Sequence, residues 1–208
     1  MRAFTLVYGL VLVLVVNVKI LVADLGSQWG HRIYRTLRDL NVETKMLPVD
    51  SPLSEITDVD GLVFSGGALR IGKGEDPMAA NCGSYMDYLD EKNIPFMGVC
   101  AGQQLIVLHY GGEVKPARVP EFGNVELIVD DADDLFAGLP EKFTVWASHN
   151  DEVFRAPGFK TLAHSKDVPI HAFKHEKKPI YGTLFHPEVA HTQHGEEIYA
   201  NFVKLCKR

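Results

Sequence analysis

Short apolar runs alternate with helical segments through the first half of the chain, and this pattern constrains the fold more than any other feature. Four runs rich in apolar and β-branched residues are expected to form buried strands, at residues 18–24, 42–47, 61–64 and 94–99. Helices are expected from Trp29 to Leu40, with Ser27 as N-cap, and at 84–91 and 101–110. This alternation predicts a parallel sheet with helices on both faces.

In the second half of the chain, strand-like pieces follow one another closely. They lie at 125–129, 143–147, 159–163, 170–173 and 180–185. The last two flank His175-Glu176-Lys177-Lys178 and predict a hairpin, and residues 196–207 predict a closing helix. We therefore expect an α/β fold whose mixed, mostly parallel central sheet is flanked by helices and gains antiparallel strands in its C-terminal half.

Length and composition limit the possible classes of function. The length of 208 residues favours one domain over two. The formal net charge of −6, without a run of Lys or Arg, fits nucleic-acid binding poorly. Cys82, Cys100 and Cys206 are odd in number and lack C-x-x-C spacing, which is typical of a reducing compartment. We expect a cytoplasmic protein that binds neither nucleic acid nor membranes.

The N-terminal residues do not fit this pattern. An apolar stretch runs from Leu6 to Val18 after Arg2. It is short for a membrane helix, which needs about 20 apolar residues. The nearest candidate cleavage site, at 22–24, lies inside the first expected strand. A membrane anchor and a cleaved signal peptide stay open, but we expect residues 1–17 to be an apolar extension and residues 18–208 to form the domain.

One cysteine lies where an expected strand turns directly into a helix. Gly98-Val99-Cys100-Ala101-Gly102 has small residues around this turn, as in a nucleophile elbow that lifts one side chain above the carboxyl edge of a sheet. The amides and dipole of the helix N-terminus favour a thiolate there. The alternative is that Cys100 is a small buried apolar residue, as free cysteine often is.

A base and its orienting group are offered by Phe185-His186-Pro187-Glu188. On an extended segment, residues i and i+2 point to the same side, so that Glu188 can hold the imidazole of His186. Together with Cys100 they would form a Cys-His-Glu triad. The alternative for His186 is a half-buried imidazole at a strand end.

An oxyanion site is suggested by Ser65-Gly66-Gly67, which follows the strand at 61–64. If that strand is parallel to the strand before Cys100, the backbone N–H groups of Gly67 and Ala101 can both face a reacting carbonyl oxygen. The alternative is an ordinary glycine-rich turn.

Two other histidine groups offer a rival metal site, which we do not expect. Glu188, His191 and His194 are close in sequence, and His171 and His175 are four residues apart. The latter pair lies on an expected strand and its turn, where this spacing does not bring two ligands together as it does on a helix. We expect no metal in this chain.

These motifs together resemble the class I glutamine amidotransferase family. The resemblance rests on segments 64–67 (FSGG), 98–104 (GVCAGQQ) and 185–189 (FHPEV), with support from 24–28 (DLGSQ), 120–123 (PEFG), 146–153 (WASHNDEV) and 186–192 (HPEVAHT). It covers the chain from Lys19 to the C-terminus and fits most closely a stand-alone glutaminase subunit that serves a separate synthetase. It implies a flavodoxin-like fold.

The resemblance also implies an activity and further site residues. Cys100 would attack the side-chain amide of L-glutamine and form a γ-glutamyl thioester, with His186 and Glu188 as its partners. By the same resemblance, the substrate-binding residues are Gln104, Ser148, His149, Asn150 and Asp151. For Gln104 the alternative is a buried amide paired with backbone, and for Asp151 it is a loop carboxylate.

The partner and the cofactors follow from the same resemblance. The chain has no Gly-rich nucleotide loop, so ATP and Mg²⁺ would belong to the synthetase subunit in trans, and the glutaminase would need no cofactor of its own. Three alternatives stay open: a glutaminase that serves a different synthase, a free-standing γ-glutamyl hydrolase, and a binding module without turnover.

Overall fold

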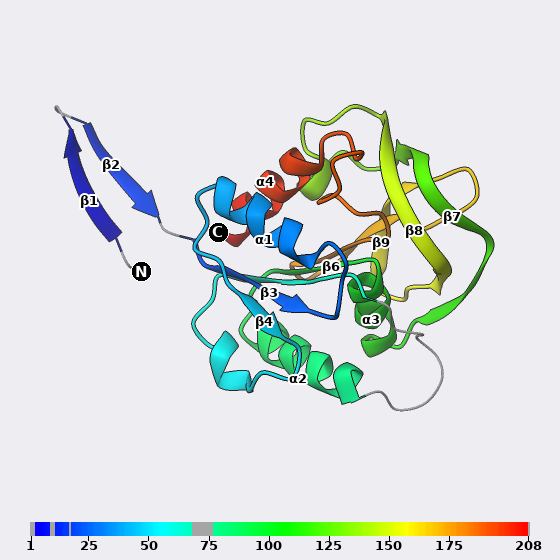
Figure 1. Ribbon diagram of the computed structural model, residues 1–208, viewed down its shortest axis with the longest axis horizontal. Helices are drawn as coiled ribbons and strands as arrows, with labels where there is room; N and C mark the ends of the chain where they lie inside the picture. Colours follow the sequence, from blue (N-terminus) through cyan, green and yellow to red (C-terminus); the bar gives the residue numbers. More distant parts are fainter. Residues whose placement is uncertain (1–2, 9–10, 17, 68–76, 208) are drawn as a thin grey trace.

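A nine-stranded mixed sheet, counted over the described residues, forms the centre of the molecule (Figure 1). The computed structural model describes residues 3–8, 11–16, 18–67 and 77–207. In spatial order the strands are β4 (Met46–Pro48), β3 (Ile20–Asp24), β5 (Gly61–Phe64), β6 (Phe96–Val99), β11 (Ile180–Thr183), β10 (Ala172–His175), β9 (Phe159–His164), β7 (Glu113–Val129) and β8 (Lys142–Arg155). Neighbours from β4 to β11 are parallel, and those from β11 to β8 are antiparallel. This arrangement confirms the predicted fold class and the hairpin of β10 and β11.

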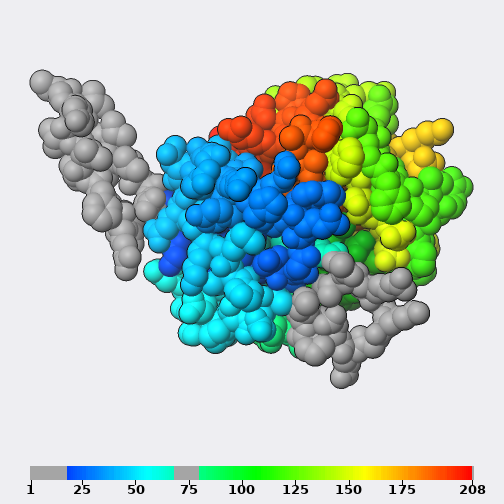
Figure 2. Space-filling model, viewed as in Figure 1, coloured from blue at the N-terminus to red at the C-terminus, as the bar shows by residue number. Residues whose placement is uncertain are grey.

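Helices cover both faces of the parallel part of the sheet. They are α1 (Gly30–Asp39), α2 (Pro77–Glu91), α3 (Ala101–His109) and α4 (Gly195–Cys206). The apolar side chains of α1 and α4 belong to one core cluster, and those of α2 and α3 belong to a second. Figure 2 shows α1 and α4 packed against each other on the viewed face.

The alternation of side chains along β3 explains why its sequence is apolar without interruption. Ile20 and Val22 pack into the cluster of α1 and α4, whereas Leu21 and Ala23 pack into the cluster of α2 and α3. All four are buried, because a central parallel strand has a helical layer on each side.

Two strands are much longer than the sequence indicated. β7 and β8 extend well beyond the expected strands at 125–129 and 143–147. Most residues of β7 are exposed or half-buried, so their side chains carry little apolar pattern. The paired backbones of β7 and β8 form these extensions, and backbone pairing leaves no signature in composition.

Other boundaries shift for local reasons. The strand expected at 42–47 is shorter in the structure, where it forms β4 at the sheet edge. The helix expected at 84–91 is longer: α2 begins at Pro77, and the small residues in its first half give no apolar pattern with a helical period. Ser27 is not the N-cap of α1: Trp29 holds that position, and the Ser27 hydroxyl accepts the N–H of Trp29 at 3.1 Å in the preceding turn.

Two strands lie within the N-terminal residues. β1 (Ala3–Tyr8) and β2 (Val11–Val16) pair antiparallel and form a sheet of their own. Among the described residues, no helix is both long enough and apolar enough to cross a membrane. The side chains of residues 1–17 lie outside the described part, and the domain boundary after residue 17 stays a prediction.

Glycine is required where β6 and α3 approach other backbone. A Cβ atom at Gly102 would lie 2.5 Å from the carbonyl oxygen of Phe64, and one at Gly98 would lie 2.3 Å from the carbonyl carbon of Gly102.

We expect Gly102→Ala to lower the free energy of unfolding by about 2–3 kcal/mol through overpacking. Urea denaturation checks this value. Gly83→Ala on α2 is the matched control, since its Cβ would lie 3.5 Å from the nearest atom and alanine favours a helix; an equal loss in both variants would contradict the packing argument.

Candidate active site

Cys100 is held in an unusual backbone conformation between β6 and α3. Its φ of 50° and ψ of −105° lie in a region that costs a non-glycine residue about 1–3 kcal/mol. Its N–H donates to the carbonyl oxygen of Thr183 at 2.7 Å, and its own carbonyl oxygen accepts the N–H of Gln104 at 3.1 Å. These bonds at the end of β11 and the start of α3 hold the sharp turn that the elbow motif predicts.

His186 and Glu188 are in direct contact. The Nδ1 atom of His186 lies 2.9 Å from Oε1 of Glu188, and both side chains are buried. The expected contact is present, but its expected cause is wrong. β11 ends at Thr183, and a turn closed by the N–H of Val189 and the carbonyl oxygen of His186 at 3.2 Å brings the two side chains together.

Neighbouring groups fix this pair in place. The Tyr199 hydroxyl donates to Oε2 of Glu188 at 3.4 Å, and the Thr192 hydroxyl donates to the carbonyl oxygen of His186 at 2.7 Å. The N–H of His186 donates to the carbonyl oxygen of Trp146 at 2.9 Å, and the N–H of Trp146 donates to the Thr192 hydroxyl at 2.9 Å. The turn is therefore bound to β8 on one side and to α4 on the other.

The surroundings of His186 favour its charged form. Burial lowers the pKa of this imidazole, but hydrogen bonds to Cys100 and Glu188 and the charges of both groups outweigh burial and raise the pKa to about 10. The Trp29 ring packs edge-on against the imidazole, with 4.6 Å between ring centroids. At neutral pH an imidazolium therefore faces Cys100, which suits stabilisation of a thiolate.

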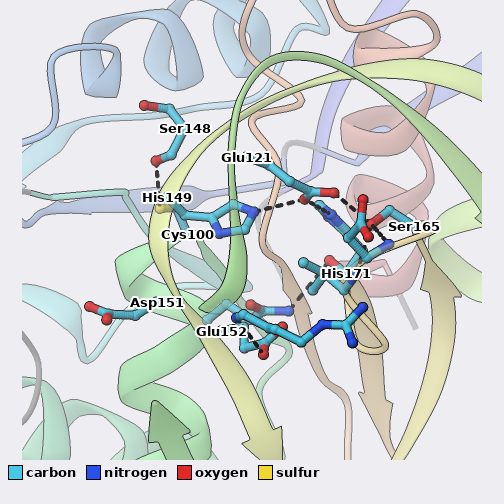
Figure 3. Close-up of polar contacts among 12 residues, drawn as sticks. Cys100, Glu121, Ser148, His149, Asp151, Glu152, Ser165 and His171 are labelled. Atoms are coloured by element: carbon cyan, nitrogen blue, oxygen red, sulfur yellow. Dashed lines mark hydrogen bonds and ion pairs between the residues drawn. The ribbon is translucent and has the colours of Figure 1, made fainter. Parts of the chain in front are cut away.

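A cavity of about 260 Å³ opens above Cys100 and His186. Its walls come from the turn after β3, the glycine turn after β5, the elbow, and the strands β7 and β8. The lining residues are Gly26, Ser27, Gln28, Trp29, Gly67, Cys100, Phe122, Ser148, Asn150 and His186. The carbonyl oxygen of Ser148 lies 3.8 Å from Sγ of Cys100 (Figure 3). A small substrate in this cavity would thus contact the thiol, the imidazole and several backbone groups.

Other predicted site residues do not line the cavity. Ala101 begins α3 beside Cys100, and Glu188 lies behind His186. Gln104 is buried, and its side-chain amide donates to the carbonyl oxygen of Asp151 at 3.0 Å, which is the alternative expected for a buried amide. The roles of Gln104 and Asp151 in substrate binding, and of Ala101 in oxyanion binding, stay predictions.

Five cavity residues were not identified as site residues from the sequence: Gly26, Ser27, Gln28, Trp29 and Phe122. Trp29 fitted the apolar face of the first helix, yet it precedes α1 and reaches His186. Phe122 is 64% exposed, although it is a large apolar side chain. Its exposure and its place on the cavity wall follow from the folded chain, and neither leaves a signal in the sequence.

A buried cluster on the far side of β8 was also missed. Oε2 of Glu121 lies 3.0 Å from Nε2 of His149 and 2.6 Å from Nε2 of His171 (Figure 3). Among the described residues, these three are the group whose ligand atoms come close enough to suit a metal ion. Of the groups considered from the sequence, Glu188 pairs with His186, His191 packs against Trp146, and His171 belongs to the buried cluster instead.

Selective alkylation tests the environment of Cys100. We expect iodoacetamide at neutral pH to modify Cys100 before Cys82 or Cys206, because Cys100 lines the cavity beside a charged imidazole, whereas the other two are buried elsewhere. Burial also raises the pKa of the Cys206 thiol well above its ordinary value. Peptide mass spectrometry after short reaction times measures the order. Faster modification of Cys82 or Cys206 in folded protein would contradict this description.

Comparisons with known proteins find relatives of one family along most of the chain. The family model "Glutamine amidotransferase class-I" matches residues 21–206. A protein from Thermococcus kodakarensis that is named as a subunit of a glutamine-hydrolyzing GMP synthase is 48% identical over 190 residues, which are 90% of this chain and 98% of that protein. A protein of the same name from Methanocaldococcus jannaschii is 44% identical over 191 residues, covering 90% and 97%.

Solved structures agree with the fold. A crystal structure described as that of a GMP synthase subunit from Thermoplasma acidophilum is 44% identical, covers 92% of this chain and 94% of its own, and superposes with a TM-score of 0.84. A glutamine amidotransferase from Thermotoga maritima has a TM-score of 0.72 at 19% identity, covering 83% and 77%, and supports the fold alone.

Proposed function

This chain belongs to the class I glutamine amidotransferase family, and from that premise we propose that it is the glutaminase subunit of a GMP synthase. The observation that carries the proposal is the meeting of a strained Cys100 and a buried His186–Glu188 pair at one cavity. Two relatives that are 48% and 44% identical, each named as a subunit of a glutamine-hydrolyzing GMP synthase, support the more specific assignment.

In the proposed reaction, Sγ of Cys100 attacks the side-chain amide carbon of L-glutamine. The tetrahedral intermediate collapses as the C–N bond breaks, and the imidazolium of His186 gives its proton to the departing ammonia. A γ-glutamyl thioester remains. His186 then takes a proton from a water molecule that attacks the thioester, which releases glutamate and regenerates Cys100, while Glu188 orients the imidazole.

Backbone groups are proposed to hold the substrate. The N–H groups of Gly67 and Ala101 would donate to the oxyanion of the tetrahedral intermediate. The segment from Ser148 to Asp151, together with Gln104, would bind the amino-acid end of glutamine. Ser148 and Asn150 support this role because both line the cavity.

The ammonia is proposed to pass to a separate ATP pyrophosphatase (synthetase) subunit that converts XMP to GMP. In this division, ATP and Mg²⁺ bind to the partner, and the glutaminase needs no cofactor or metal. Residues 18–208 would form the catalytic domain, with residues 1–17 outside it, and the complex would act in the cytoplasm.

Ammonia release from glutamine tests the proposal. We expect release by this chain to rise when the synthetase subunit, ATP and XMP are added, and GMP to form with glutamine as nitrogen donor. An equal rate of ammonia release with and without the partner would agree with the glutaminase chemistry but contradict the GMP synthase assignment. It would favour another synthase or a γ-glutamyl hydrolase. No release under any of these conditions would contradict the glutaminase function itself.

A further inference from the structure

Glu121 is a buried carboxylate with three donors around it. It lies directly opposite His149 in the pairing of β7 and β8. Its Oε2 contacts Nε2 of His149 at 3.0 Å and Nε2 of His171 at 2.6 Å, and its Oε1 accepts the hydroxyl of Ser165 at 2.7 Å. All four residues are at most 8% exposed. A buried carboxylate is tolerated only when such donors replace water.

The protonation of this cluster follows from its contacts. The Nδ1 atoms of His149 and His171 are buried and have no hydrogen-bond partner among the described residues. A proton on Nδ1 of His171 would leave an unpaired buried N–H, so this imidazole is neutral and donates its Nε2 proton to Glu121. Nε2 of His149 donates to the same carboxylate oxygen. Burial raises the pKa of Glu121, but these hydrogen bonds outweigh burial and hold the pKa well below its ordinary value. For His171 the charged form is the protonated one, so burial lowers its pKa.

The distances favour a hydrogen-bonded cluster over a metal centre. Two ligands on tetrahedral zinc, each bonded at 2.0–2.1 Å, stand about 3.3 Å apart. The Glu121–His171 contact of 2.6 Å is shorter than that and suits a charge-assisted hydrogen bond. The orphaned Nδ1 atoms point the same way, since metal-bound histidines almost always use their second nitrogen.

The cluster lies immediately behind the cavity wall. Side chains alternate along a strand, so His149 points inward while its neighbours Ser148 and Asn150 line the cavity. On β7, Phe122 follows Glu121, pairs with Ser148 and lines the same cavity. The Glu121–His149 bond therefore fixes the piece of backbone that brings the Ser148 carbonyl oxygen to 3.8 Å from the Cys100 thiol.

His171 extends this support to both reacting side chains. Its carbonyl oxygen accepts the N–H of Leu184 at 2.7 Å, two residues before His186. The same oxygen accepts the side-chain amide of Gln103 at 3.4 Å, three residues after Cys100. One buried cluster is thus in contact with the substrate-facing wall, the helix that begins after Cys100 and the segment that leads to His186.

We propose that Glu121, through His149 and His171, is a positioning residue that holds the β7–β8 wall in register with Cys100 for glutamine binding. This inference rests on the proposed glutaminase function. Glu121 touches no reacting atom: it acts through the backbone of residues 148–150. Weakening the cluster should therefore affect the KM for glutamine more than kcat.

Glu121→Gln tests the inference, with Glu126→Gln as its matched control on an exposed position of the same strand. We expect Glu121→Gln to raise KM for glutamine roughly tenfold while kcat changes less than about threefold, since small misplacements of a binding wall are costly. Glu126→Gln should match the wild type. A purely structural role would reduce the amount of active enzyme and lower kcat at unchanged KM, and that result would overturn the inference.

A second variant and a metal assay complete the test. Ser165→Ala removes one donor from Glu121 and should raise KM in the same direction by a smaller factor; if Glu121→Gln does not fold, an unchanged KM in Ser165→Ala overturns the inference. Stoichiometric zinc in the purified protein would also overturn it.

Alkylation separates this inference from the proposed function. If the wild type releases no ammonia, the proposed function fails. In that case a faster reaction of Cys100 with iodoacetamide in Glu121→Gln than in Glu126→Gln still supports the positioning role, and equal rates overturn it.

Discussion

Cys100→Ala is expected to abolish ammonia release from glutamine, with a loss of at least about 10⁴-fold in kcat. The thiol is the proposed nucleophile, and among the described residues that line the cavity no other side chain carries a thiol that could form a thioester. Removing a small side chain that is 8% exposed should leave the fold intact. A continuous ammonia assay with the synthetase subunit, ATP and XMP present measures the loss.

The matched control is Cys82→Ala, which removes a buried thiol on α2 away from the cavity. Its activity per folded molecule should equal that of the wild type. If Cys100→Ala keeps activity, or if Cys82→Ala loses as much, the assignment of the nucleophile is wrong.

Glu188→Gln is expected to lower kcat by about 10³-fold, because the amide no longer holds the imidazole in the tautomer and orientation that the reaction requires. Glutamine is close in size to glutamate, so the turn should persist. The carboxylate also helps to raise the pKa of His186 to about 10, and the variant should lower that pKa. NMR titration of the imidazole measures the second effect independently of turnover.

The same substitution should change how stability depends on pH. Because the pKa of His186 is higher in the folded protein than its ordinary 6.5, its charged form stabilises the fold fully below pH 6.5, and this contribution is lost as pH rises toward 10. Urea unfolding of wild type and Glu188→Gln should therefore differ most at low pH within that window. A difference that grows with pH would contradict the assigned ion pair.

Glu197→Gln is the control for Glu188→Gln. Glu197 also contacts a histidine, with 3.3 Å between its Oε1 and Nδ1 of His194, but that pair lies at the surface. Surface pairs contribute little, so activity and stability should stay close to wild type. Comparable losses in both variants would mean that the effect is not specific to the triad.

The part of the fold that could be predicted is the part whose sequence reports burial. β3, β5 and β6 are apolar because helices cover both faces, and the chain alternates between strand and helix around them. The extensions of β7 and β8 could not be found in this way, because their residues are largely exposed and their pairing uses backbone groups.

In the site, too, some residues could be identified from the sequence and others only from the folded chain. His186 and Glu188 are two residues apart and could be paired from sequence, although a turn and not a strand unites them. Glu121 meets His149 and His171 across 28 and 50 residues, so only the folded chain reveals that cluster. Trp29 was assigned to a helix face because its spacing fits one, and only the structure shows it at the cavity.

Trapping the thioester tests the central claim most directly. The protein is mixed with glutamine and the synthetase complex, quenched rapidly in acid and analysed by peptide mass spectrometry. We predict one γ-glutamyl group on the peptide that contains Cys100, and its absence when Cys100→Ala is treated in the same way. Ammonia release without this adduct, or an adduct on Cys82 or Cys206, would contradict the account.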